Sequence, residues 1–289
     1  MLRTEQNSTP PVSRFLVSTD WLAGRLSDPA VVAVDGSYFM PTLNRDAHAE
    51  YLNGHIPGAV FFDIEAVSDH STDLPHMLPG PKQFGEAAGG LGIGETDTVV
   101  VYDSIGLFSA ARVWWTFRIL GAKTVFILDG GLPKWKAEGR PIEAGEVKRP
   151  AKKFTSEMNV AAVAMLDDMR MAITSDDVQI VDARSAARFH GKAPEPRPGL
   201  RSGHMPGSYN VPYDSLLANG RLGSREQIEA AFKNARVDLD KPIITSCGSG
   251  VTAAILTLAL ESIGTQPKGL YDGSWSEWGS RPDLPIERD

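Results

Sequence analysis

The hexapeptide GHIPGA at residues 54–59 recurs as GHMPGS at residues 203–208, and this pair of motifs decides the fold. Upstream of each motif lies a short β-branched run that ends in aspartate, VVAVD at 31–35 and VQIVD at 178–182. The same order of segments at a nearly constant offset indicates an internal duplication. The sequence therefore predicts two copies of one structural unit.

Each copy continues into an apolar strand, a turn and a helix, TVVVYDSIGLFSAARVWWTFRIL at 98–120 and PIITSCGSGVTAAILTLALESIG at 242–264. Short strands rich in valine and isoleucine that alternate with helices predict a mostly parallel sheet with helices on both faces. We therefore expect an α/β fold with an N-terminal domain over 15–145, a linker over 146–160 and a C-terminal domain over 161–289.

The helix of the second copy is predicted over residues 251–263, where apolar side chains recur at helical spacing and form one buried face. These side chains are Val251, Ala254, Ile255, Leu258 and Ile263. In folds of this class, ligand chemistry lies at the carboxyl ends of strands, where turns open into helix N-termini. The turn before this helix is therefore the first place to look for a site.

The overall composition excludes several classes of protein. The 289 residues carry 29 basic and 36 acidic side chains, a net charge of −7, which argues against binding of nucleic acid. No apolar run reaches the length of a membrane helix, and the first residues contain no secretory signal. A single cysteine cannot form an internal disulfide, so we expect a cytoplasmic protein.

That single cysteine, Cys247, lies in the turn between the predicted strand 243–246 and the predicted helix. Gly248 and Gly250 let the backbone curl so that amides at a helix N-terminus face an anion. Such a site stabilises a thiolate and lowers the pKa of the thiol, which makes Cys247 a candidate nucleophile. Free cysteines are more often small buried hydrophobes, but the glycines and the position in the turn favour the functional interpretation.

Other chemistries fit this turn poorly. A cysteine-dependent phosphatase needs an arginine six residues after the cysteine, and Ala253 occupies that position. The glycine spacing also matches a loose dinucleotide fingerprint, but too little chain follows for the rest of such a unit. The histidines show no metal-binding spacing, so we expect neither a metal nor a cofactor. In the first copy Asp103 stands where the second has Cys247, which indicates one inactive and one active copy.

A tandem pair with an inactive first half and an active second half resembles the two-domain rhodaneses, which are sulfurtransferases. The resemblance covers about residues 15–288 and depends on Asp182-Ala183-Arg184, Gly203-His204-Met205-Pro206-Gly207 and the loop that begins at Cys247. Thiosulfate enzymes of this family place basic residues directly after the cysteine. The uncharged sequence Cys-Gly-Ser-Gly-Val-Thr is instead similar to that of the 3-mercaptopyruvate sulfurtransferases.

The resemblance implies a role for each of several residues. Cys247 would carry a persulfide held by the loop residues Gly248, Ser249, Gly250, Val251 and Thr252. Arg188 and Arg197 would bind the carboxylate and keto oxygen of the substrate, unless they only pair with nearby acids such as Glu195. Asp63, His76 and Ser249 would handle protons, although His76 could equally be a loop residue packed at the domain interface.

The predicted reaction moves sulfur from 3-mercaptopyruvate through the Cys247 persulfide to a thiol, a thioredoxin-like protein or cyanide, and it releases pyruvate. Two alternatives stay open. One keeps the enzyme class but uses thiosulfate as the sulfur donor. The other is a non-catalytic sulfur-binding protein, in which the thiol of Cys247 would have an ordinary pKa of about 8.5.

Overall fold

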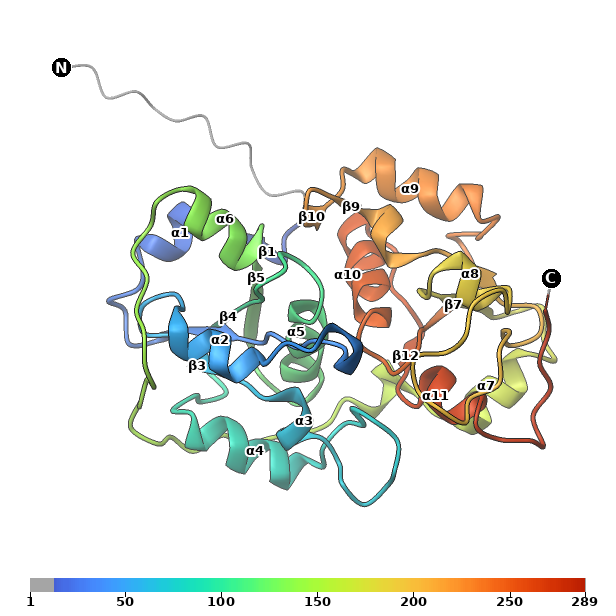
Figure 1. The fold of residues 1–289 in the computed structure, drawn as a ribbon, viewed down its shortest axis with the longest axis horizontal. Helices are drawn as coiled ribbons and strands as arrows, with labels where there is room; N and C mark the ends of the chain where they lie inside the picture. The colour runs from blue at the N-terminus through green and yellow to red at the C-terminus, as the bar shows by residue number, and fades with distance from the viewer. Residues whose placement is uncertain (1–12, 289) are drawn as a thin grey trace.

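The computed structural model describes residues 13–288, in which two five-stranded sheets lie side by side (Figure 1). The first sheet contains β1 (Leu16–Val17), β2 (Val31–Asp35), β3 (Val60–Phe61), β4 (Thr98–Tyr102) and β5 (Thr124–Leu128). The second contains β6 (Val163–Ala164), β7 (Gln179–Asp182), β8 (Tyr209–Asn210), β11 (Ile243–Ser246) and β12 (Gly269–Tyr271). Residues 1–12, where no secretory signal is expected, lie outside the described part.

The two sheets have the same topology. Their strand orders are β1-β5-β4-β2-β3 and β6-β12-β11-β7-β8, and every pairing within them is parallel. Corresponding strands therefore occupy corresponding places, which confirms the predicted tandem α/β fold. A short antiparallel hairpin, β9 (Leu217–Ala218) and β10 (Arg221–Leu222), lies apart from both sheets.

The central strands are buried on both faces. In β4, Val99 and Val101 belong to one hydrophobic cluster, whereas Val100 and Tyr102 belong to another. Because successive side chains of a strand point to opposite faces, continuous apolar runs are needed where helices cover both sides. In the first domain α4 (Pro81–Gly90) and α5 (Ala110–Ile119) cover one face, and α1 (Thr19–Ala23) and α6 (Gly131–Ala137) cover the other.

The second domain repeats this arrangement. The cluster shared with the first domain includes side chains of α9 (Arg225–Asn234) and α10 (Ala253–Ile263), and a separate cluster includes those of α7 (Leu166–Ala172) and α11 (Ser274–Trp278). Short elements fill the connections: α2 (Ala47–Asn53), α3 (Ile64–Val67), α8 (Ala186–Phe189) and the 3₁₀ turns η1 (Pro41–Leu43), η2 (Val160–Ala162) and η3 (Tyr213–Leu216).

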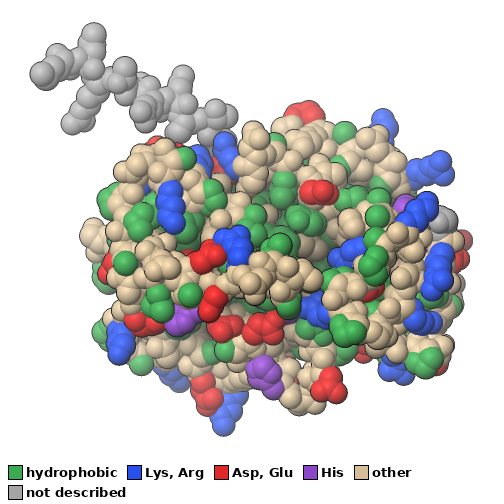
Figure 2. Space-filling model, viewed as in Figure 1, with side chains coloured by type: hydrophobic (Ala, Val, Ile, Leu, Met, Phe, Trp, Pro, Cys, Tyr) green, Lys and Arg blue, Asp and Glu red, His purple; other side chains and the backbone are tan. Residues whose placement is uncertain are grey.

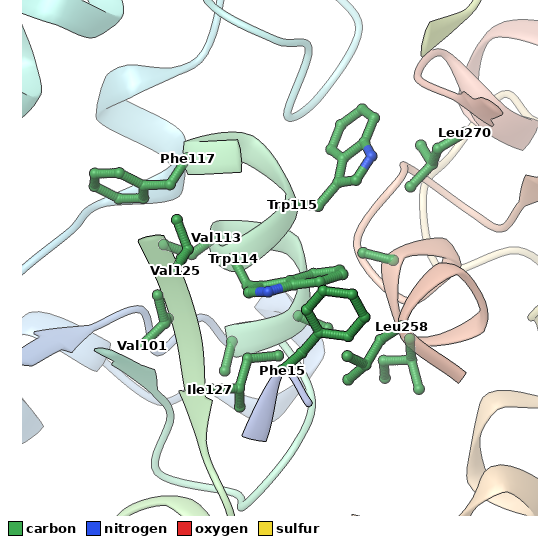
Figure 3. Close-up of a cluster of buried hydrophobic side chains, with 14 of the residues drawn as sticks. Phe15, Val101, Val113, Trp114, Trp115, Phe117, Val125, Ile127, Leu258 and Leu270 are labelled. Atoms are coloured by element: carbon green, nitrogen blue, oxygen red, sulfur yellow. The ribbon is translucent and has the colours of Figure 1, made fainter. Parts of the chain in front are cut away.

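The helix after Cys247 differs from its prediction. We expected an amphipathic helix with one buried face, but every residue of α10 except Ser262 is buried. The reason is that α10 packs against its own sheet and also against α5 of the other domain. Figure 3 shows Trp114 of α5 beside Phe15 and facing the helix that carries Leu258. The domain interface is therefore part of the hydrophobic core.

The connection between the domains is packed rather than free. The amide of Lys152 donates to the carbonyl of Gly89, and the Phe154 ring meets Phe84 edge-on at 5.2 Å. A Cβ added at Gly89 would lie 2.4 Å from the Lys152 carbonyl oxygen, so only glycine allows this approach. The segment therefore runs along α4 before it enters the second sheet. Among the helices of the described part, none has the length and hydrophobicity that crossing a membrane requires.

Candidate active site

A pocket of ≈ 440 Å³ lies between the two domains. The second domain contributes Cys247, Gly248, Ser249, Val251, Thr252, Arg188 and Arg197 to its wall. The first domain contributes Tyr38, Met40, Leu43, Ile105, Leu107 and Phe108. Figure 2 shows hydrophobic side chains in the recess between the domains, with basic side chains near its edge. The pocket thus brings together the predicted nucleophile and both predicted substrate-binding arginines.

The cysteine loop (residues 247–252) connects β11 to α10. Cys247 is only 2% exposed, and Gly250 has a φ of +77°, a conformation that glycine adopts without strain. The amides of Gly248, Ser249, Val251 and Thr252 donate to no protein acceptor within residues 13–288. Several donors of one loop are therefore available to an anion bound at Cys247, as the sequence predicts.

The aspartate loop (residues 103–108) occupies the corresponding place in the first domain. Its Asp103 carboxylate accepts hydrogen bonds from four amides. Three belong to the loop, those of Ile105 at 2.9 Å, Gly106 at 2.8 Å and Phe108 at 2.7 Å, and the fourth is that of Ala110 at the start of α5, at 2.9 Å. The turn thus binds its own carboxylate as an internal anion. This geometry demonstrates that such a turn can surround a negative group with amides.

Arg188 lies over the cysteine loop and is also paired with an acid. Its Nη2 is 2.5 Å from Glu195 Oε2, the pairing that the alternative interpretation anticipates. However, a Cβ added at Gly248 would lie 2.9 Å from the same Nη2, so the guanidinium directly faces the loop. Glu195 is buried and also accepts from Arg184, which in turn pairs with Asp182. The ion pair with Glu195 therefore holds Arg188 over the cysteine loop and does not draw it away from the pocket.

Arg197 contacts His76 instead of an acid. Its Nη2 lies 2.9 Å from His76 Nε2. Because a guanidinium can only donate, Nε2 is the acceptor and the proton of the neutral ring is on Nδ1. Burial, followed by the charges of Arg197 and Arg112, lowers the pKa of His76 from 6.5 to about 3. His76 therefore stays neutral near pH 7 and orients Arg197.

The predicted trio of Asp63, His76 and Ser249 is not connected by contacts in the described residues. Asp63 is exposed and caps α3, where its Oδ1 accepts from the amides of Glu65 and Ala66. Ser249 lies in the pocket, whereas the ring of His76 is directed at Arg197. The acid beside His76 is Glu65, whose Oε1 is 3.6 Å from Nδ1. Sequence spacing did not single out Glu65, because the contact depends on how the loop after α3 folds back.

A buried interdomain ion pair lies behind the cysteine loop and was also missed. Arg112 Nη2 of α5 is 2.7 Å from Asp272 Oδ1 and 2.6 Å from the carbonyl of His76. Asp272 Oδ2 accepts from the amide of Leu78. Arg112 thereby connects the His76 loop of the first domain to the end of β12. A lone arginine within the apolar run Ala110–Phe117 is the signal that could have revealed it.

Comparison with known protein families supports the duplication. Residues 18–138 and residues 165–281 each match the model of the rhodanese-like domain. Among solved structures, the crystal structure of SseA from Escherichia coli, described as a 3-mercaptopyruvate sulfotransferase with the rhodanese fold, superposes with a TM-score of 0.84 at 45% identity. The alignment covers 90% of this chain and 98% of that one.

Curated relatives have consistent names. The 3-mercaptopyruvate sulfurtransferase of E. coli K12 is 47% identical over 274 residues, which are 94% of this chain and 98% of the relative. The human protein of the same name is 41% identical over 281 residues, 95% of each chain. An Arabidopsis thaliana relative, thiosulfate/3-mercaptopyruvate sulfurtransferase 1, is 42% identical over 303 residues and covers 97% of this chain and 80% of that protein.

Proposed function

The chain belongs to the rhodanese family, among its two-domain 3-mercaptopyruvate sulfurtransferases, and we propose that it transfers the sulfur of 3-mercaptopyruvate through a persulfide on Cys247. The observation that carries the proposal is the composition of the pocket. Its only thiol lies in an uncharged turn with available amides, and the positive charge comes from three arginines outside that turn, of which Arg184 is already paired with Asp182 and Glu195.

In the first half-reaction the Cys247 thiolate attacks the sulfur of 3-mercaptopyruvate. The new S–S bond forms as the C–S bond breaks, and the electron pair of that bond stays on carbon as the enolate of pyruvate. A proton then converts the enolate to pyruvate. The amides of the cysteine loop stabilise the negative charge on the sulfur atoms, since preorganised donors are effective where charge develops.

Arg188 and Arg197 bind the substrate in this proposal. 3-Mercaptopyruvate has one carboxylate and a neighbouring keto oxygen, and a planar guanidinium is suited to both. Glu195 holds Arg188 and His76 orients Arg197, so each arginine is fixed before the substrate arrives. Such preorganisation lowers the entropic cost of alignment.

Ser249 is our candidate proton donor to the enolate because its hydroxyl is in the same pocket as Cys247. His76 would assist by positioning Arg197, and Asp63 by capping the helix that leads towards the His76 loop. A Ser249→Ala variant should lower kcat for pyruvate formation more than it lowers the yield of persulfide in a single turnover.

In the second half-reaction a thiolate or cyanide attacks the outer sulfur of the persulfide. A bond to the acceptor forms as the S–S bond breaks, and the electron pair of that bond restores the Cys247 thiolate. The acceptor can be a small thiol, a thioredoxin-like protein or cyanide, and ping-pong kinetics should result. We also propose a cytoplasmic location, where such thiols stay reduced. This location rests on the single cysteine, which forms no disulfide.

Intact-mass measurement tests the proposal directly. After treatment with 3-mercaptopyruvate, the wild-type protein should gain the mass of one sulfur atom, located on Cys247 by peptide mapping. The Cys247→Ser variant should gain none and should form no pyruvate. Wild-type protein without added sulfur, or pyruvate formation by the variant, would contradict the mechanism.

Thiosulfate is a second candidate donor, favoured by the name of the Arabidopsis relative. The pocket disfavours a compact dianion next to Cys247, because the residues that follow this cysteine are uncharged. We therefore expect kcat/KM to be higher for 3-mercaptopyruvate than for thiosulfate, measured side by side. If neither donor adds sulfur and alkylation gives an ordinary thiol pKa, the non-catalytic sulfur-binding alternative holds.

A further inference from the structure

The residue after the β12 turn has an unusual backbone. Ser274 is fully buried and has a φ of +49°, a left-handed conformation that residues with a side chain rarely adopt. The first domain has Gly131 at the corresponding place, in Leu-Asp-Gly-Gly against Tyr-Asp-Gly-Ser, with a φ of +55°. The fold thus needs this conformation in both copies, and only the active copy has a side chain there at the cost of strain.

The hydroxyl of Ser274 makes three hydrogen bonds. It donates to the carbonyl of Tyr271 at 2.8 Å, which directs the oxygen lone pairs away from β12. Ser274 Oγ then accepts from the amide of Cys247 at 3.2 Å and from the amide of Gly250 at 3.1 Å. One buried oxygen therefore fixes the cysteine loop at the nucleophile and again three residues later.

In the aspartate loop the equivalent amide has a different acceptor. There the amide of Gly106, which corresponds to Gly250, donates to Asp103 of its own turn. Cys247 has no carboxylate, so the cysteine loop needs an acceptor from elsewhere in the fold. A hydroxyl supplies this acceptor without adding a second negative charge next to a thiolate or persulfide.

We propose that Ser274 is a positioning residue for sulfur transfer, whose hydroxyl holds the Cys247 and Gly250 amides so that the other amides of the cysteine loop remain available to the sulfur anion. This inference rests on the proposed function of Cys247. Ser274 itself lies behind the loop and is not among the residues that line the pocket. Its strained backbone is maintained because the hydroxyl is needed there.

Three variants test the role. Ser274→Gly and Ser274→Ala both remove the hydroxyl, but only glycine relieves the left-handed strain, so Ser274→Gly should be the more stable of the two. Ser246→Ala is the matched control, because Ser246 precedes Cys247 and its buried hydroxyl has no hydrogen-bond partner in the described residues. The readouts are the melting temperature, the thiol pKa of Cys247 from pH-dependent alkylation, and the single-turnover rate of persulfide formation.

Both Ser274 variants should raise the thiol pKa and slow persulfide formation by about 10- to 100-fold, a loss of the size that follows when the outer-shell partners of metal ligands are removed. These two defects should be equal in the two variants despite their different melting temperatures, and Ser246→Ala should show neither. A purely structural serine would give defects that follow stability, with Ser274→Ala the worse variant. That pattern, or wild-type values in Ser274→Gly, would overturn the inference.

The failure of this inference is distinguishable from failure of the proposed function. If wild-type protein gains no sulfur from 3-mercaptopyruvate, the proposed function fails whatever the variants do. The alkylation measurement still reports on the loop in that case, because it needs no sulfur donor. If wild-type protein forms the persulfide and the variants match it in rate and thiol pKa, only the role of Ser274 fails.

Discussion

The aspartate loop and the cysteine loop share a backbone but differ in what satisfies their amides. Both begin at the end of a central strand, and both contain a glycine with positive φ, Gly106 and Gly250. In the first domain the amides bind Asp103, so the turn is closed by its own side chain. In the second domain the side chain of Cys247 is shorter and has no carboxylate oxygens, so several amides are left available. The aspartate loop therefore illustrates the anion binding that we propose for the sulfur of Cys247.

The aspartate loop also contributes to the interdomain pocket. Ile105, Leu107 and Phe108 line the pocket opposite the cysteine loop. The duplication has thus converted one turn into an apolar wall for the other.

Beside each of these loops, an aspartate at the end of a strand forms an ion pair with an arginine of the opposite domain. Asp272 pairs with Arg112, and Asp129 pairs with Arg221 of the β9–β10 hairpin. The two pairs differ in burial, since the Arg112 side chain is 2% exposed and that of Arg221 is 44% exposed. The buried pair lies beside the cysteine loop, where Arg112 also donates to the carbonyl of Gly250.

The largest expected effect comes from making the active loop a copy of the inactive one. In Cys247→Asp the new carboxylate should accept hydrogen bonds from the loop amides, as that of Asp103 does. Sulfur transfer should be lost entirely, because the variant has no thiol. Pyruvate formation and intact mass measure this loss. Because the amides gain charged hydrogen bonds, Cys247→Asp should unfold at the same or a higher temperature than Cys247→Ser. A markedly less stable aspartate variant would mean that the two loops are not equivalent.

Breaking the interdomain ion pairs should have the next largest effect. Arg112→Leu leaves Asp272 buried without its partner and should lower the free energy of unfolding by about 3–5 kcal/mol. Arg221→Leu, the matched variant of the pair whose arginine is exposed, should cost less than Arg112→Leu, because water screens Arg221 although Asp129 is largely buried. Urea denaturation of both variants provides the comparison. Equal losses would show that burial does not distinguish the two pairs.

Neutralising the internal anion of the inactive loop should have a smaller effect. Asp103→Asn replaces one of the two acceptor oxygens by a donor that faces amides, so the free energy of unfolding should fall by about 1.5–3 kcal/mol. Since the aspartate loop is a wall and not a reacting group, kcat should fall less than in Ser274→Gly. Denaturation and steady-state kinetics on the same preparation would check both. A larger loss of kcat than in Ser274→Gly would assign the loop a direct part in the reaction.

The smallest effect concerns His76 and pH. Its pKa is about 3 in the folded protein against 6.5 normally, so the unfolded chain binds more protons between these values. Stability should therefore fall as the pH falls below 6.5, by at most about 1.4 kcal/mol per pH unit from this group. His76→Asn, which tolerates the φ of +60° at this position, should lose this part of the slope.

A second buried group, Asp35, also changes the stability with pH, and the comparison of the two proteins removes its contribution. Burial raises the pKa of Asp35 to about 6, so this group stabilises the fold as the pH falls through that value. Asp35 acts in the opposite direction to His76, but it is present in both proteins and cancels in their difference. Free energies of unfolding at pH 7 and pH 5 for wild type and His76→Asn give the result. An unchanged slope would show that folding does not lower the pKa of His76.

Local sequence patterns determined the backbone of this protein. The repeated motifs and β-branched runs predicted two parallel sheets, because a strand buried on both faces must be apolar throughout. Two glycines around Cys247 predicted the anion-binding turn, since backbone conformation there depends on residues a few positions apart. The arginines Arg188 and Arg197 were found by resemblance, and the pocket contains both.

Only the tertiary structure decided which side chains meet across the domain interface. Two of these contacts join residues more than one hundred positions apart: His76 with Arg197, and Arg112 with Asp272. The burial of α10 on all sides likewise depends on the docked domains. No local periodicity encodes such contacts, because they depend on the packing of two independently patterned units. The sequence determined that a thiol lies in an amide-lined turn, and domain docking determined what holds that turn and what faces it.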